Sequence, residues 1–198
     1  MSRIKNLSSA DAIARLKAGN ARYVSDTPEA LRRDSARRAE LTGGQSPYAT
    51  IIACADSRVG PEIVFDEGLG DLFVIRVAGN INSPDVLGSV EYASLHLGVN
   101  LVVVLGHQSC GAVGAAVAAD GGADAHGNHI DSLVDAILPA VQQAKAGGGD
   151  DLGDDSIRAN ASLQAALMGG DEQAMAGIDG CDVVPAYYSL ATGEVSFL

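Results

Sequence analysis

The apolar positions of the chain fall into short continuous runs, separated by stretches with a helical repeat. Runs at 49–53, 72–77 and 101–105 have the length and composition of buried strands. Residues 183–188 followed by 194–198 indicate a final strand, a turn and an antiparallel edge strand. Strands that alternate with helices predict an α/β fold, in which helices flank a mainly parallel central sheet on both faces.

Two helices are indicated most clearly, one before the first strand and one after the second. An apolar stripe predicts a helix over about residues 9–23, with Ser8 as its N-cap. Another helix is expected to begin after Ser83, with Pro84 as its first residue, and to stop at Gly98.

The second half of the chain predicts two more helices and two loops. One helix begins from Cys110, and an amphipathic helix covers about residues 130–145. Residues 120–128 and 147–155 are rich in glycine and aspartate, so we expect exposed, mobile loops there and assign them no function.

The segment from 29 to 41 has few apolar positions. It is expected to form an exposed helix, or an arm that lies on a partner subunit, and its arginines are expected to be solvated. They are Arg32, Arg33, Arg37 and Arg38. With 198 residues the chain is long enough for one core, so we expect a single domain over 1–198. Its parts are an N-terminal helical arm at 1–45 and an α/β core at 46–198.

Charge and composition exclude several partners. The formal net charge of -12 repels nucleic-acid backbones and anionic lipid headgroups, so no nucleic acid and no membrane surface is expected. The apolar runs are shorter than the roughly 18 residues that cross a bilayer. Charged residues interrupt the N-terminus, unlike a signal peptide. Three cysteines far apart in sequence fit a reducing compartment, and we expect a cytoplasmic protein.

Candidate chemistry lies at the ends of two strands. Cys54 ends the first strand, and His107 and Cys110 lie just past the strand at 101–105. Ligands gather at the carboxyl ends of parallel strands. Two thiolates and one imidazole suit zinc, and three ligands leave a fourth position open for water, as in catalytic sites. Taken singly, each residue is more often plain packing, and Cys181, without such neighbours, is expected to be an inert thiol.

Asp56 and Arg58 follow the first candidate ligand closely. Arg58 can hold the Asp56 carboxylate by paired hydrogen bonds, so that it accepts a proton or hydrogen bond from zinc-bound water. A structural salt bridge is the plainer alternative. If the hydrogen bonds from Arg58 were lost, Asp56 could become the fourth zinc ligand and close the site.

These residues resemble the β-class carbonic anhydrases, and the resemblance covers nearly the whole chain. It implies one zinc ion per chain on Cys54, His107 and Cys110, with Asp56 and Arg58 as a catalytic dyad. It also implies a homodimer as the smallest working unit, often paired into a homotetramer. The segments that carry the resemblance are Gln45-x-Pro47, 54–59, 70–76, 78–80, Glu91-Tyr92 and 106–111.

The same resemblance suggests how substrate is held. Gln45 and the Gly111 N–H match donors to substrate or bicarbonate oxygens, and Phe73 and Tyr92 match apolar pocket positions, although core packing explains those two equally well. In this family the pocket lies at a subunit interface, so the resemblance leaves open which chain's zinc each of these residues serves.

The positions just before Cys54 indicate the subtype. Ile51 and Ala53 replace the tryptophan and glycine of members that carry a second, regulatory bicarbonate site. The replacement argues against that site and favours a resting state in which Asp56 is paired with Arg58.

The expected activity is reversible hydration of carbon dioxide to bicarbonate and a proton by zinc-bound hydroxide, rising from neutral to alkaline pH because two thiolates offset the metal charge. One alternative is hydrolysis of carbonyl sulfide or carbon disulfide on the same scaffold. Another is a zinc-binding scaffold without turnover, against which Arg58 and Gln45 count. A nucleotide loop at 106–114 lacks the full dinucleotide fingerprint.

Overall fold

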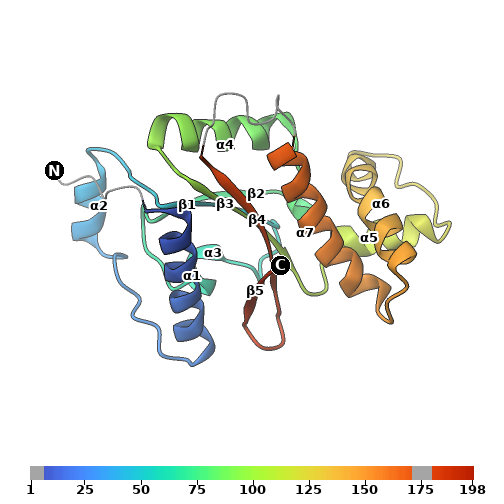
Figure 1. Cartoon of the computed structure of the whole chain (residues 1–198), viewed down its shortest axis with the longest axis horizontal. Coiled ribbons are helices and arrows are strands. Elements are labelled where there is room, and N and C mark those ends of the chain that lie inside the picture. The colour runs from blue at the N-terminus through green and yellow to red at the C-terminus, as the bar shows by residue number, and fades with distance from the viewer. Residues whose placement is uncertain (1–6, 171–179) are drawn as a thin grey trace.

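A five-stranded sheet forms the centre of the computed structural model, which describes residues 7–170 and 180–198 (Figure 1). The strand order is β2-β1-β3-β4-β5. The first four strands pair in parallel and β5 is antiparallel to β4, so the expected architecture is confirmed. The strands are β1 (Ala49–Ala53), β2 (Leu72–Arg76), β3 (Leu101–His107), β4 (Asp182–Tyr188) and β5 (Val195–Phe197).

Helices cover both faces of the sheet. Residues of α1 and α3 share one buried cluster with the sheet, and residues of α4 and α7 share another on the opposite face. The pair α5 and α6 packs beside α7 near the carboxyl ends of the strands (Figure 1). The helices are α1 (Ser9–Val24), α2 (Ser35–Leu41), α3 (Pro61–Val64), α4 (Pro84–Leu97), α5 (Gly111–Asp120), α6 (Ile130–Gly147) and α7 (Leu152–Gly170), with a 3-10 turn η1 (Ala78–Asn80).

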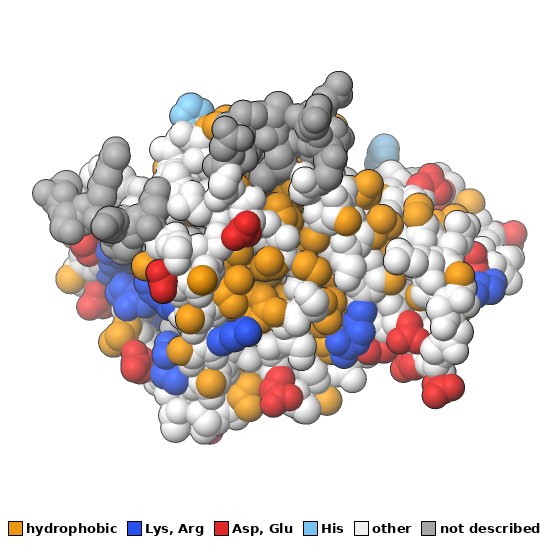
Figure 2. Space-filling view, viewed as in Figure 1, with side chains coloured by type: hydrophobic (Ala, Val, Ile, Leu, Met, Phe, Trp, Pro, Cys, Tyr) orange, Lys and Arg blue, Asp and Glu red, His pale blue; other side chains and the backbone are white. Residues whose placement is uncertain are grey.

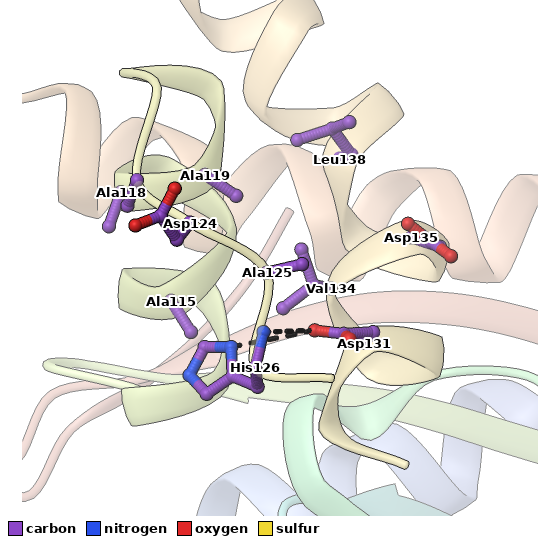
Figure 3. A pocket seen from close by; sticks show the side chains of 11 residues that line it. Ala115, Ala118, Ala119, Asp124, Ala125, His126, Asp131, Val134, Asp135 and Leu138 are labelled. Carbon is purple, nitrogen blue, oxygen red and sulfur yellow. Dashed lines mark hydrogen bonds and ion pairs between the residues drawn. The ribbon is translucent and has the colours of Figure 1, made fainter. Parts of the chain in front are cut away.

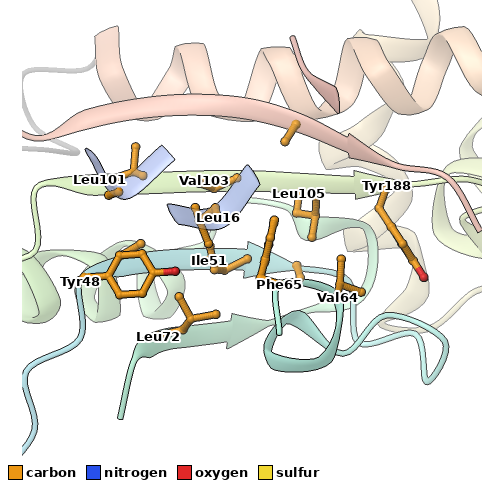
Figure 4. Close-up of a cluster of buried hydrophobic side chains, with 14 of the residues drawn as sticks. Leu16, Tyr48, Ile51, Val64, Phe65, Leu72, Leu101, Val103, Leu105 and Tyr188 are labelled. Carbon is orange, nitrogen blue, oxygen red and sulfur yellow. The ribbon is translucent and has the colours of Figure 1, made fainter. Parts of the chain in front are cut away.

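Successive residues of the central strands point to opposite faces, as a pleated strand requires. Ile51 and Val103 pack with Leu16 of α1 and with Phe65, while Ile52 and Val104 pack on the other face (Figure 4). All five residues of β1 and all seven of β3 are buried, which explains why they appear in the sequence as uninterrupted apolar runs.

The expected helix caps are present. Ser8 accepts a hydrogen bond from the Asp11 N–H at the start of α1, and Ser83 accepts one from the Val86 N–H at the start of α4. Gly98 ends α4 in the left-handed conformation at φ 71°. One boundary differs from expectation, because β3 continues to His107 and ends two residues later than its apolar run.

Helix α7 was not expected from the sequence, and the predicted loop at 147–155 was wrong for most of its length. Only residues 148–151 separate α6 from α7. Buried polar side chains interrupt the apolar stripe that normally reveals a helix, because Ser156, Asn160 and Gln164 lie on its inward face.

The prediction that the arginines between 29 and 41 are solvated was wrong for three of the four. Arg32 donates to Asp71 at 2.5 Å and to Glu67 at 2.9 Å, and Arg38 alone stays exposed without a described ion pair. These contacts belong to a larger set, which we call the arginine clasp. It consists of Arg15, Arg22, Arg32, Arg33 and Arg37 with the buried acids Asp66, Glu67 and Asp71.

Two acids of the arginine clasp, Asp66 and Asp71, stay ionised although they are buried. Burial acts to raise the pKa of Asp66, but hydrogen bonds from Arg22 and from two backbone N–H groups outweigh it and leave the pKa below its ordinary value. The pKa of Asp71 is lowered in the same way by Arg32 and the Gly68 N–H. The clasp therefore holds α1 and the segment before α2 against the loop between α3 and β2.

Close packing of α1 depends on one glycine. A Cβ atom at Gly19 would lie 1.8 Å from the Phe65 carbonyl oxygen, which no side chain tolerates. Figure 2 shows apolar side chains gathered over β4 and β5 between α1 and α7, with charged side chains around them. Within residues 7–170 and 180–198, no helix combines the length and the apolar character needed to span a bilayer.

Candidate metal centre

Three residues from three elements meet at the carboxyl edge of the sheet. Cys54 follows the last residue of β1, His107 is the last residue of β3, and Cys110 is the N-cap of α5. Their ligand atoms all lie within 4.8 Å of one another, and the two sulfurs are 4.0 Å apart. All three residues are buried. The parallel strands β1 and β3 thus bring together the three ligands that the sequence suggested.

The imidazole of His107 is oriented for metal binding. Its Nδ1–H donates to the Gln108 carbonyl at 3.0 Å, which assigns the proton to Nδ1 and leaves Nε2 with a free lone pair. Nε2 is buried and has no hydrogen-bond partner among the described residues. A buried polar atom without a partner is costly, and a cation among these ligand atoms would satisfy it.

The chemistry of the Cys54 and Cys110 thiols also favours a bound cation. A hydrogen bond from Cys110 lowers the pKa of Cys54, and the Gly79 N–H adds to this effect at 3.4 Å. The pKa of Cys110 is raised, because it donates that hydrogen bond and is itself buried. Two thiolates at this separation repel one another unless a positive ion lies between them. Two sulfurs and one imidazole nitrogen form a donor set that fits zinc.

Asp56 and Arg58 lie together beside this cluster. Arg58 donates to both carboxylate oxygens of Asp56, from Nε at 2.9 Å and from Nη2 at 2.7 Å, and its backbone N–H donates at 2.9 Å. These bonds hold the pKa of Asp56 well below its usual range. The carboxylate reaches within 3.9 Å of His107 Nε2. An ionised, oriented acceptor therefore borders the position that a metal would occupy.

A further guanidinium, for which no role was predicted, fixes the end of β1. Arg76 donates to the Cys54 carbonyl at 3.0 Å and to the Asp56 carbonyl at 2.5 Å. The position of Arg76 at the end of β2, which pairs with β1, was the signal from which this role could have been predicted. Arg76 thereby sets the backbone of both the candidate ligand and the neighbouring acid.

The candidate substrate contacts divide into two groups. Gly111, the first residue of α5, adjoins Cys110. Apart from its chain neighbours and the backbone of its own helix, no described atom lies within 4 Å of where its Cβ would be. Gln45, Phe73 and Tyr92 do not reach this chain's cluster. Gln45 is exposed and precedes β1, whereas Cys54 follows it. Phe73 pairs with Thr50, about 13 Å along the strand from Cys54 at 3.3 Å per residue.

Phe73 and Tyr92 instead form a separate aromatic pair. Their ring centroids lie 6.3 Å apart, and the Tyr92 ring lies 5.1 Å from that of His96. Tyr92 is 50% exposed, which differs from the core packing considered for it. The pair is thus open to a neighbouring molecule at the amino end of the sheet.

Two cavities lie beside α5, and the smaller one adjoins the cluster. One of about 210 Å³ is bordered by Cys110 and by Asp151 and Asp154 of the turn into α7. Another, of about 550 Å³, lies between α5, α6 and the loop that joins them. Figure 3 shows His126 of that loop facing Asp131, which accepts hydrogen bonds from the His126 and Gly127 backbone N–H groups. The alanines that line this larger cavity belong to α5 and to the loop after it, and none of the three candidate ligands borders it, so it is separate from the candidate metal centre.

Comparison with known proteins agrees with this geometry. The sequence profile of the family described as carbonic anhydrase matches residues 49–195. Carbonic anhydrase 2 of Mycobacterium tuberculosis is 47% identical over 133 residues, which are 67% of this chain and 64% of that protein. The carbonic anhydrase of Mycolicibacterium smegmatis is 44% identical over 67% of this chain and 65% of its own. The chain therefore spans just under two thirds of these relatives.

Solved structures share the fold. The β-carbonic anhydrase of Coccomyxa, solved with acetazolamide, superposes with a TM-score of 0.70 at 26% identity, over 96% of this chain and 81% of that one. One of two tetrameric β-carbonic anhydrases from Sordaria macrospora also gives a TM-score of 0.70, at 22% identity over 96% and 95% of the chains. The profile match and the shared architecture establish that this chain belongs to the carbonic anhydrase family and has the fold of its β class.

Proposed function

We propose that the chain binds one zinc ion through Cys54, His107 and Cys110 and catalyses the reversible hydration of carbon dioxide to bicarbonate. The observation that carries this proposal is the convergence of two thiols and an unpartnered imidazole nitrogen beside the Asp56–Arg58 pair. Zinc bound there supplies the Lewis-acid charge that makes a water molecule nucleophilic at neutral pH. Because only three protein ligands converge, the site keeps a position for that water.

Asp56 has two roles in this proposal. Held by Arg58, its carboxylate accepts a hydrogen bond from the attacking water and so fixes the direction in which the oxygen lone pair points. The same pairing keeps Asp56 from becoming the fourth ligand, since both of its oxygens are engaged. We infer that the site is open in its resting state. Ile51 and Ala53 of β1 are fully buried in the core, which supports the absence of a regulatory bicarbonate pocket there.

Carbon dioxide is uncharged and offers few polar groups to bind. Its site therefore has to be small and apolar, with hydrogen-bond donors for the oxygen that gains negative charge during the reaction. Gly111 lies at the N-terminus of α5, where backbone N–H groups are free of intrahelical partners. We propose that its N–H stabilises the oxygen that gains charge as bicarbonate forms. The empty space around its Cα admits a substrate close to the backbone.

The remaining contacts are proposed to come from a second copy of the chain. Gln45, Phe73 and Tyr92 lie toward the amino end of the sheet in their own chain, yet Gln45 and Tyr92 are exposed and available to a neighbour. A homodimer in which each copy supplies these residues to the other's metal centre would complete both pockets. Pairing of dimers into a tetramer is compatible with this arrangement. The three free cysteines fit a reducing compartment, and we place the protein in the cytoplasm.

Stopped-flow hydration of carbon dioxide tests the proposal on protein of measured zinc content. The rate should scale with bound zinc and rise from about pH 6 to 9, around the range in which zinc-bound water titrates. The Cys54→Ser variant should lose both the zinc and the rate, whereas Cys181→Ser, far from the cluster in sequence and structure, should keep both. Hydration without zinc would refute the proposal. Faster turnover of carbonyl sulfide than of carbon dioxide would reassign the substrate.

A further inference from the structure

A tight turn at residues 78–82 lies directly against the Cys54 sulfur. The Gly79 N–H donates to Cys54 Sγ at 3.4 Å. Gly79 has a left-handed backbone at φ 73°, and a Cβ there would meet the Ile137 side chain at 2.6 Å. Glycine is therefore required to bring this N–H to the sulfur, both by conformation and by space.

Two amide side chains of α7 hold this turn from behind. Asn160 Nδ2 donates to the Gly79 carbonyl at 2.8 Å. One helical turn later, Gln164 Oε1 accepts from the Asn82 N–H at 2.9 Å, and its Nε2 donates to Asn160 Oδ1 at 3.3 Å. Asn160 is 0% exposed and Gln164 is 2% exposed. The carbonyl of Gly79 and the N–H of Asn82 are thus fixed by one connected pair of side chains.

Burying two amides is costly unless their hydrogen bonds are made, and apolar side chains would fill the same space without that cost. The polar pair must therefore contribute something other than packing. What it specifies is the orientation of the peptide groups around Gly79, which an apolar contact leaves free to rotate. The orientation of Gly79 in turn decides whether its N–H points at Cys54.

Hydrogen bonds to a thiolate withdraw electron density from the sulfur and so reduce the charge that it donates to a metal. We propose that Asn160, supported by Gln164, is a positioning residue that tunes the metal centre by holding the Gly79 N–H on the Cys54 sulfur. This inference rests on the proposed zinc site. Helix α7 contributes no ligand, but through Asn160 it would influence how strongly the metal accepts electron density.

Cobalt(II) is the probe, because its sulfur-to-metal charge-transfer absorption reports thiolate donation directly. Wild-type protein and Cys54→Ser are measured first. If the wild type shows no such band, or if Cys54→Ser keeps the same band, then the proposed metal site itself fails and the inference has no basis. A band that Cys54→Ser diminishes establishes the site independently of Asn160.

The variants are Asn160→Asp, which keeps the shape but removes the donor, and Asn160→Ser, which is neutral and too short to reach Gly79. Asn20→Asp is the matched control. Asn20 is also a buried amide. It donates to the Val64 and Gly193 carbonyls and accepts from the Val195 N–H, and none of these groups is a candidate ligand or a hydrogen-bond partner of Gly79. Zinc affinity is measured in parallel by competition with a chelator, and circular dichroism identifies variants that fold.

Either folded Asn160 variant should shift the charge-transfer band to longer wavelength, because the Cys54 sulfur then donates more charge. Zinc affinity should fall on the order of 10-fold, because the sulfur is no longer held in position, the size of effect typical of groups that orient metal ligands. Asn20→Asp should leave both unchanged. An unmoved band and unchanged affinity in a folded Asn160 variant would overturn the inference. The same holds if Asn20→Asp moves the band equally, since the effect would then follow general destabilisation.

Discussion

Asp56 accepts hydrogen bonds from the Arg58 guanidinium at both carboxylate oxygens, at 2.9 Å and 2.7 Å. Two residues apart in sequence, they form a closed ring that holds both carboxylate oxygens on the guanidinium and leaves Asp56 Oδ2 one lone pair with which to accept a hydrogen bond from water. Arg58 also donates to the Ser109 carbonyl at 3.2 Å and is thereby tied to the turn that carries Cys110. Whether the Asp56 carboxylate is free to bind a metal held by the three candidate ligands therefore depends on Arg58.

Replacing Arg58 should close the site. In Arg58→Gln the pKa of Asp56 should rise toward its ordinary value, and the freed carboxylate should bind the metal. We expect carbon dioxide hydration to fall on the order of 10- to 100-fold at unchanged zinc content, as for other groups that orient a metal site. Arg58→Lys should recover little, because an ammonium cannot hold both oxygens.

Arg38→Gln serves as the matched control for this variant, since Arg38 is exposed on α2 and remote from the cluster. Hydration rate and zinc content are measured side by side for all three proteins. Full activity in Arg58→Gln would mean that the Asp56–Arg58 pair is only structural.

Mixed dimers should reveal whether Gln45 acts across the subunit interface. Gln45→Ala keeps the metal ligands, and Cys54→Ser keeps Gln45, so each homodimer alone should be nearly inactive. In a mixed dimer the intact zinc of one copy would receive Gln45 from the other. Denaturing the two variants together and refolding them with zinc should restore activity toward one working site per mixed dimer.

The control for the mixing experiment is a mixture of Cys54→Ser with His107→Ala, in which neither copy has a complete ligand set. That mixture should stay inactive. If Gln45→Ala mixed with Cys54→Ser also stays inactive although mixed dimers form, Gln45 does not serve a neighbouring zinc.

Sequence alone predicted the part of the molecule that local patterns determine. The buried strands β1 and β3 were visible as apolar runs, and their carboxyl ends predicted that Cys54, His107 and Cys110 would meet. The sequence also contained an unused signal for Gln45, because β1 lies between it and Cys54 and so places the two at opposite ends of the strand.

Long-range polar contacts were not visible in the sequence. Asn160 donates to the carbonyl of Gly79, which lies 81 positions earlier in the sequence, and the periodicity of apolar residues does not predict such a contact. The arginines before α2 seemed solvated because their carboxylate partners Glu67 and Asp71 lie more than 30 residues later. Helix α7 was missed for the same reason, since buried polar side chains interrupt the apolar stripe on its inward face.

The arginine clasp should contribute measurably to stability. Arg32 pairs with two buried acids, so Arg32→Gln leaves both Glu67 and Asp71 with fewer partners. We expect a loss of about 2 kcal/mol in the free energy of unfolding, less than for a fully buried pair because Arg32 is partly exposed. Urea denaturation of Arg32→Gln beside Arg38→Gln measures it. Equal midpoints for the two variants would contradict a stabilising clasp.

Acid should weaken the same region. The folded-state pKa values of Asp66 and Asp71 lie below those of the unfolded chain, so their contribution is complete above about pH 4 and is lost as pH falls through the folded values. Asp66→Asn should lower the urea midpoint at pH 7, and its difference from wild type should shrink below about pH 4.

Zinc release in acid affects the wild type and Asp66→Asn alike, so the difference between their midpoints isolates the carboxylate. A difference that stays constant from pH 7 to pH 3 would show that Asp66 contributes no proton linkage.

Gly19 bears on how this protein can be engineered. A common route to a more robust protein replaces glycines inside helices by alanine, which is worth about 1 kcal/mol in an open helix. At Gly19 the new methyl group would collide with the Phe65 carbonyl, so the rule reverses and α1 would be pushed off the sheet. The neighbours Arg15 and Arg22 would move with it. A substitution that propensity scales recommend would thus loosen the amino-terminal third of the protein while leaving every metal ligand in the sequence intact.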